Sequence, residues 1–184
     1  AKASRSRRSA QTVLHGILGE TLTLMAPILP FTAEEAWAAM PASAGRPDSV
    51  HLALFPEFGR TVMAGDEAAA WEDLRAIREI VLKELEKARE EKLIGNSLEA
   101  RVTLRVPNAQ SALLTTHADE LKDLFIVSDV VIGAGGDGAL TVAVDKAPGR
   151  KCARCWNYST SVGTSAAHPD FCRRCDDVVE GRAE

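Results

Sequence analysis

The chain has 184 residues, of which 46% are hydrophobic and 26% are charged, and its formal net charge at pH 7 is −4. This composition is typical of a globular protein, and the length suits one domain or two small ones. No apolar run approaches the roughly 20 residues that cross a bilayer, so we expect no membrane partner. The negative net charge also argues against a protein that coats nucleic acid over its whole surface.

Basic residues nevertheless gather at the two ends of the chain. The first eight residues contain no acidic side chain and four basic ones, Lys2, Arg5, Arg7 and Arg8. Residues 146–175 contain six basic side chains against a single acid, Asp170. A polyanion is therefore expected to bind near the ends and not at the acidic centre. The chain starts without methionine and enters a helical pattern at once, so we expect a piece of a larger protein.

Residues 9–25 are predicted to form a helix with one buried face. Their apolar side chains recur at helical spacing, at Val13, Leu14, Ile17, Leu18, Leu22 and Met25. Pro27 and Pro30 are expected to end this helix, because proline has no backbone N–H and crowds the preceding turn.

A second, short helix is predicted to begin at Thr32. Thr32 and Glu35 have the spacing of a capping box, in which the two side chains satisfy backbone N–H groups of the first turn. This helix is expected to stop at Pro41. Residues 41–65, rich in Pro, Gly and Ser, are interpreted as an extended segment packed across the helices.

The longest helix is predicted over residues 66–92. Its apolar stripe consists of Trp71, Leu74, Val81, Leu85 and Ala88, with Ile77 beside it. In residues 98–106 the hydrophobic period changes from 3.6 to 2, which predicts a half-buried strand. Residues 111–124 are predicted to form a short helix, and residues 125–132 and 139–144 a hairpin-like pair of strands around a glycine-rich loop.

All four cysteines of the chain lie near its end, as the pairs Cys152/Cys155 and Cys172/Cys175. Sixteen residues separate the two Cys-x-x-Cys pairs, which is the spacing of a zinc site. Four thiolates leave no open position for water, so the expected Zn²⁺ is structural and not catalytic. The alternatives are two disulfides, a redox dithiol, or a site in which His168 replaces one sulfur.

Together these patterns predict an α+β protein in three parts. Residues 1–96 are interpreted as a helical segment that includes the long helix, residues 97–147 as a small α+β unit, and residues 148–184 as a four-cysteine zinc knuckle.

Several segments together resemble the C-terminal end of bacterial-type isoleucyl-tRNA synthetases. They are residues 7–14, 25–37, 49–52, 88–104 and the knuckle that starts with Lys-Cys-Ala-Arg-Cys-Trp. The resemblance implies that residues 1–96 belong to an anticodon-binding domain whose partners are the tRNA anticodon stem-loop and the rest of the synthetase chain. It also implies a monomeric, cytoplasmic parent enzyme that ligates isoleucine to tRNA using ATP. The family's His-x-Gly-His and Lys-Met-Ser-Lys-Ser motifs are absent here, so we expect no catalytic residue in this piece.

Two alternative functions are considered. The knuckle also resembles the zinc finger of formamidopyrimidine-type DNA glycosylases, although those enzymes begin with a proline nucleophile and this chain begins Ala1-Lys2. In the second alternative, the knuckle is a purely structural brace that contacts no nucleic acid.

The candidate RNA-binding residues follow from the basic ends and the resemblance. Lys2, Arg5, Arg7 and Arg8 are candidate phosphate contacts. In the knuckle the candidates are Lys151, Arg154, Trp156, Arg173 and Arg174, since unpaired bases stack on aromatic rings and guanidinium planes. The alternative roles are that Trp156 covers the zinc site and that the arginines balance the −2 charge of four thiolates and one Zn²⁺.

Overall fold

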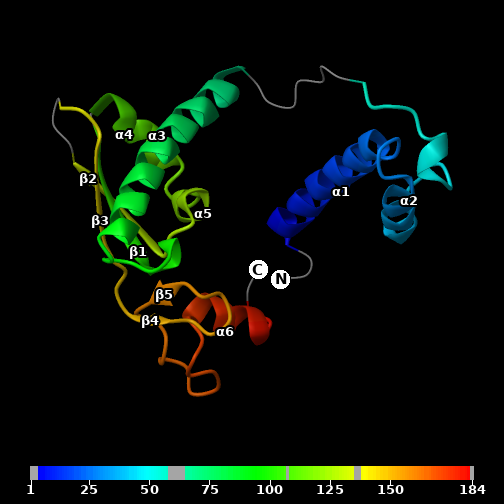
Figure 1. Cartoon of the computed structure of the whole chain (residues 1–184). Coiled ribbons are helices and arrows are strands. Elements are labelled where there is room, and N and C mark those ends of the chain that lie inside the picture. The colour runs from blue at the N-terminus through cyan, green and yellow to red at the C-terminus, as the bar shows by residue number, and fades with distance from the viewer. Residues whose placement is uncertain (1–3, 58–64, 107, 135–137, 183–184) are drawn as a thin grey trace. The chain divides into compact units, whose positions relative to one another are not determined.

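The computed structural model describes residues 4–57, 65–106, 108–134 and 138–182 (Figure 1). The chain divides into two compact units, Ala1–Val62 and Met63–Ala183. Helices and strands occur together in the described residues, which confirms the predicted α+β class. No helix among them is long and apolar enough to cross a membrane.

The first unit is helical. It contains helix α1 (Arg5–Met25), helix α2 (Pro30–Ala39) and a short 3-10 helix, η1 (Val50–Leu52). Helix α1 begins after Ser4, whose hydroxyl oxygen accepts a hydrogen bond from the backbone N–H of Arg7 at 3.3 Å. It ends before Pro27, as predicted.

The capping box predicted at Thr32 and Glu35 is wrong. Helix α2 begins two residues earlier, at Pro30, so Thr32 lies inside its first turn. Proline suits this first helical position because its fixed φ is already helical and its missing N–H would have had no partner there. Glu34 has a different role, since its carboxylate accepts from the Ser49 hydroxyl and the Val50 backbone N–H, both at 2.9 Å.

The core of the first unit is small and lies where the end of α1 meets α2 and η1. It consists of Leu22, Ala26, Ala33, Trp37, Met40 and Val50. The predicted buried face of α1 is therefore correct only near its end. Val13, Leu14 and Ile17 are 57%, 64% and 55% exposed, because no element described in this unit packs against that part of the helix.

The second unit contains a three-stranded sheet beside one long helix, α3 (Gly65–Glu90). Strand β1 (Ala100–Val106) lies in the centre, parallel to β2 (Asp129–Ala134) and antiparallel to β3 (Thr141–Lys146). The prediction that the last two strands pair as a hairpin is therefore wrong, since each of them pairs with β1 instead.

Two short helices connect β1 to β2 where one helix was predicted. They are α4 (Asn108–Thr116) and α5 (Leu121–Phe125), separated by a turn. A crossover of this kind is what a parallel pair of neighbouring strands requires, because a tight turn cannot return the chain in the same direction. A 3-10 turn, η2 (Ser97–Glu99), leads into β1.

The predicted stripe of α3 and the alternation of β1 form one core. Leu74, Val81 and Leu85 of α3 are at most 1% exposed, as are Val102 and Leu104 of β1. Helix α3 therefore packs with the sheet. The proposed domain boundary at residues 96 and 97 remains a prediction, and it differs from the division into compact units, which falls before α3.

The end of the second unit is a small knuckle with little regular structure. It contains the strand pair β4 (Arg150–Lys151) and β5 (Tyr158–Ser159), followed by helix α6 (Arg173–Val179). The Ser128 hydroxyl bridges the knuckle and the sheet region, since it accepts a hydrogen bond from the Tyr158 backbone N–H at 2.7 Å and donates one to the Leu98 carbonyl at 2.5 Å.

Candidate metal centre and nucleic-acid interface

The two cysteine pairs come together at one end of the knuckle. Cys152 and Cys155 lie in the turn between β4 and β5, closed by a hydrogen bond from the Trp156 N–H to the Cys152 carbonyl at 2.9 Å. Cys172 is the N-cap of α6 and Cys175 lies in its first turn. The four sulfur atoms all lie within 4.8 Å of one another.

The geometry of the sulfur atoms fits a zinc ion. The Sγ atoms of Cys155 and Cys172 are 3.7 Å apart, and Zn–S bonds of about 2.3 Å in a tetrahedron place neighbouring sulfurs about 3.8 Å apart. All four cysteines are free thiols, so the two-disulfide alternative is wrong. His168 is outside this cluster, since its Nε2 pairs with Glu180 Oε1 at 2.9 Å.

The surroundings of the sulfur atoms determine which of the four thiols lose their protons without a bound cation. Burial raises the pKa of the Cys172 thiol to about 12 and also raises the pKa of Cys175. Burial acts in the same direction on Cys152, but hydrogen bonds from the backbone N–H groups of Cys155, Cys172 and Arg154 outweigh it and lower the pKa of Cys152 to about 6. Without a bound cation the cluster therefore cannot hold four thiolates at neutral pH, whereas Zn²⁺ favours the thiolate form of all its ligands.

Two of the candidate RNA-binding arginines contact the metal site. Arg154 Nη1 donates to the Cys175 sulfur at 3.6 Å. The Cys155 sulfur beside Arg174 raises the pKa of that guanidinium. Both side chains therefore lie where they offset the negative charge of the thiolates, which is the role considered as an alternative to RNA binding.

Trp156 lies on the surface of the knuckle. Its side chain is 60% exposed, and the Lys151 ammonium lies 5.1 Å from the centre of its ring. Val162 and Phe171 pack around the cysteines instead, so the alternative that Trp156 covers the zinc site is wrong. The backbone of Trp156 has a φ of 67°, in the left-handed region that favours glycine.

The other candidate residues lie in three places. Arg173 is exposed on α6, at the same end of the knuckle as Arg174. Arg5, Arg7 and Arg8 are exposed at the start of α1, in the other compact unit. Lys2 lies outside the described residues.

Sequence reasoning missed several residues that hold the knuckle together. Arg182 pairs with three acids of α6 and its C-cap, Asp176, Asp177 and Glu180. Phe171 stacks on His168, with ring centres 5.1 Å apart. The position of an aromatic residue next to the second cysteine pair was the available signal for Phe171. The acids that lie two to six residues before Arg182 were the available signal for its ion pairs.

Comparison with known proteins identifies two parts of the chain. Residues 1–104 match the family described as the anticodon-binding domain of tRNA ligase. Residues 149–178 match the zinc finger found in FPG and IleRS. The zinc finger alone does not separate a synthetase from a glycosylase, but the match of residues 1–104 leaves no support for the glycosylase alternative.

Proteins named isoleucine--tRNA ligase are similar along almost the whole chain. The protein from Syntrophotalea carbinolica is 47% identical over 188 residues, and the one from Geobacter sulfurreducens is 42% identical over 188 residues. Each alignment covers 97% of this chain and 20% of the relative, so the chain spans about a fifth of their length. The chain therefore belongs to the family of tRNA-ligase anticodon-binding domains, and with its zinc finger it matches the C-terminal region of isoleucine--tRNA ligases.

Proposed function

We propose that this chain binds the anticodon arm of isoleucine tRNA, as part of a larger synthetase that ligates isoleucine to that tRNA using ATP. The observation that carries the proposal is the occurrence, in one chain, of the anticodon-binding family over residues 1–104 and the zinc finger over residues 149–178. No catalytic step is assigned to the residues of this chain. The proposed parent enzyme is a cytoplasmic monomer.

The proposed role of zinc is to hold the knuckle in shape. Cys152, Cys155, Cys172 and Cys175 are the proposed ligands, and the ion supplies the folding free energy that a segment with so small a core lacks. The fixed turn then holds the exposed Trp156 in place with Lys151 against its ring. In this proposal an unpaired base of the anticodon loop stacks on the free face of that ring.

The proposed electrostatic contacts divide by position. Arg173 on α6 and Arg5, Arg7 and Arg8 on α1 are exposed and are proposed to contact phosphates. Lys2 is proposed to do the same. Arg154 and Arg174, which lie against the sulfurs, are proposed to contact RNA only with the guanidinium edges that the sulfurs leave free.

The test is binding of a labelled isoleucine tRNA anticodon stem-loop to the zinc-loaded chain at low and moderate salt. A valine stem-loop and a lesion-bearing DNA duplex serve as competitors. Selective, salt-sensitive binding of the isoleucine stem-loop supports the proposal. If the valine stem-loop or the DNA duplex displaces the labelled RNA as effectively as unlabelled isoleucine stem-loop does, the proposal is wrong.

A second candidate function is a structural brace without RNA contact. The positions of Arg154 and Arg174 beside the cysteine sulfurs favour this candidate, because these two arginines can balance the thiolate charge and then need no RNA partner. It predicts that Trp156→Ala and Arg173→Glu leave stem-loop affinity unchanged, whereas loss of any cysteine unfolds the knuckle.

A further inference from the structure

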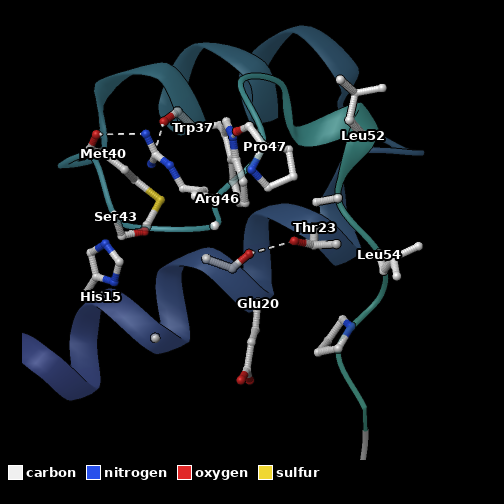
Figure 2. A pocket seen from close by; sticks show the side chains of 15 residues that line it. His15, Glu20, Thr23, Trp37, Met40, Ser43, Arg46, Pro47, Leu52 and Leu54 are labelled. Atoms are coloured by element: carbon white, nitrogen blue, oxygen red, sulfur yellow. Dashed lines mark hydrogen bonds between the residues drawn. The ribbon is translucent and has the colours of Figure 1, made fainter.

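A pocket of about 600 Å³ opens in the first unit, between helix α1 and the loop that follows helix α2 (Figure 2). This volume lies in the range of pockets that hold small organic ligands. Most of its lining is apolar or lacks a charge, including Gly16, Gly19, Met40, Pro47, Leu52, Leu54 and Pro56. The polar side chains at the pocket are those of His15, Glu20, Thr23, Trp37, Ser43 and Arg46.

Arg46 and Trp37 form a rigid, flat platform in this pocket. The guanidinium carbon of Arg46 lies 5.2 Å from the centre of the Trp37 ring. Its Nη1 donates to the Trp37 carbonyl at 3.1 Å, and its Nη2 donates to the Met40 carbonyl at 3.2 Å. The Trp37 ring is itself fixed, since its Nε1 donates to the Pro47 carbonyl at 2.9 Å and the side chain is only 5% exposed. The guanidinium plane is therefore held in one orientation by both ring and backbone.

The way Arg46 is held leaves part of its guanidinium for a ligand. Two of the five N–H donors of the Arg46 guanidinium, one on each terminal nitrogen, are already used by carbonyl groups, so three remain for a ligand. Glu20 also lines the pocket, and its negative charge disfavours an anion there. The guanidinium of Arg46 is a flat cationic group that lines the pocket, and flat heterocycles such as nucleobases stack on such planes.

Two further hydrogen-bonding side chains line one end of the pocket. His15 of α1 and Ser43 of the loop lie at the same end of the pocket in Figure 2. The hydroxyl group both donates and accepts, and a neutral imidazole has one nitrogen of each kind. The pocket therefore combines a stacking surface with edge contacts, the two elements by which proteins hold an unpaired base.

Gly16 lines the pocket at a position where a larger side chain has room. It lies inside helix α1, where glycine is less stable than alanine because it loses more backbone freedom on folding. A Cβ at Gly16 would meet no heavy atom within 4 Å, so packing inside the protein does not require glycine there.

We propose that this pocket takes one unpaired nucleobase of the bound RNA loop, stacked on the Arg46 guanidinium and read at its edge by His15 and Ser43. The proposal rests on the proposed function, because the RNA loop is that of the anticodon arm. It adds a base-binding site in the helical unit, separate from the exposed Trp156 of the knuckle.

The test is a cycle that combines protein variants with RNA variants. Gly16→Leu fills the pocket, and each unpaired loop nucleotide of the isoleucine stem-loop is replaced in turn by an abasic one. We expect Gly16→Leu to weaken binding about 5- to 150-fold, the range for removal of one base stack. One abasic position should weaken binding to the wild-type chain by a similar factor and cause no further weakening in Gly16→Leu, because both changes remove the same interaction.

Two matched variants separate pocket filling from effects on folding. Ala10→Leu adds similar bulk to an exposed position of α1 outside the pocket, and it should bind like the wild type. Gly16→Ala should raise the unfolding temperature while it weakens binding, since a methyl group stabilises the helix and enters the pocket. Arg46→Lys, which keeps the charge and removes the guanidinium plane, should show the same non-additivity with the same abasic position.

The possible failures are distinguishable. If the wild-type chain binds the stem-loop and Gly16→Leu binds as tightly as Ala10→Leu, the pocket inference is wrong and the proposed function stands. Additive effects at every abasic position lead to the same conclusion. If the wild-type chain binds no isoleucine stem-loop, the proposed function is wrong and the base pocket with it.

Discussion

Trp156 combines two unusual properties, an exposed indole ring and a left-handed backbone, and substitutions can separate them. Trp156→Ala removes the ring and keeps a Cβ in the left-handed conformation. Trp156→Gly removes the same ring and also the Cβ that makes this conformation costly. Both variants remove the indole that lies against Lys151 together with its partly buried surface, so their difference reports on the backbone alone.

The expected difference in stability follows from the φ of 67° at this residue. A residue with a Cβ is destabilised by about 1–2 kcal/mol in the left-handed region. Glycine avoids this cost, but it lowers the free energy of unfolding by about 0.4–1 kcal/mol because the unfolded chain has more conformational freedom. Trp156→Gly should therefore be more stable than Trp156→Ala by roughly 1 kcal/mol, the reverse of the usual order of these residues in regular structure.

Zinc affinity is a suitable measure of this difference, because the knuckle folds with its metal. In a competition against a chelator, the glycine variant should hold zinc about fivefold more tightly than the alanine variant, since about 1.4 kcal/mol corresponds to a factor of ten. Both variants should bind the stem-loop more weakly to the same extent, about 5- to 150-fold if the ring stacks on a base.

Two results would refute this reasoning. If the alanine variant holds zinc as tightly as the glycine variant, the left-handed backbone at position 156 carries no cost. If both variants bind the stem-loop like the wild type, the indole is not a stacking surface and its exposure has another cause. A matched control is Leu54→Ala, since Leu54 is 91% exposed in the other compact unit and should not change zinc affinity.

Three further predictions concern the metal, the charges and the core. Chelation of zinc should unfold residues 150–176 first while the α3–sheet core stays folded, because that segment has a core of little more than its cysteines; an unchanged near-UV circular dichroism spectrum after chelation would contradict this. Arg173→Glu should weaken stem-loop binding and reduce the slope of log affinity against log salt, by about 0.7–0.9 for each phosphate that the variant no longer neutralises; an equal slope in variant and wild type would place the phosphate-binding residue elsewhere. Val102→Ala should lower the free energy of unfolding by about 2–3 kcal/mol, because Val102 is fully buried in the central strand. Val131→Ala on the neighbouring strand, where the side chain is 40% exposed, is the matched control and should cost less than about 1 kcal/mol in denaturant unfolding.

The sequence was most informative where chemistry or periodicity is strictly local. The spacing of the cysteines predicted the sulfur cluster, because two Cys-x-x-Cys turns joined by a short loop can meet at one ion. The alternation of residues 98–106 predicted strand β1, and the buried stripe of the long helix predicted the face that packs on it. In both elements the period of the hydrophobic residues predicts which side chains face the core.

The sequence was least informative where two local signals compete or where the partner is distant. At the start of α2 the capping pattern of Thr32 competed with Pro30, and the proline determined the first helical residue. The glycine-rich loop after β2 suggested a hairpin, but the central strand β1 provides a pairing edge on either side. The pocket at Arg46 depends on contacts between α1 and residues after α2, which no single segment reveals.

The Ser128 hydroxyl, which bonds to both Leu98 and Tyr158, has a consequence for the order of assembly. Leu98 precedes the central strand and Tyr158 belongs to the knuckle, so this hydroxyl reaches its final geometry only after the sheet has brought Leu98 and Ser128 together. Because the knuckle follows the sheet in the chain, the complete bridge through Ser128 requires a folded sheet.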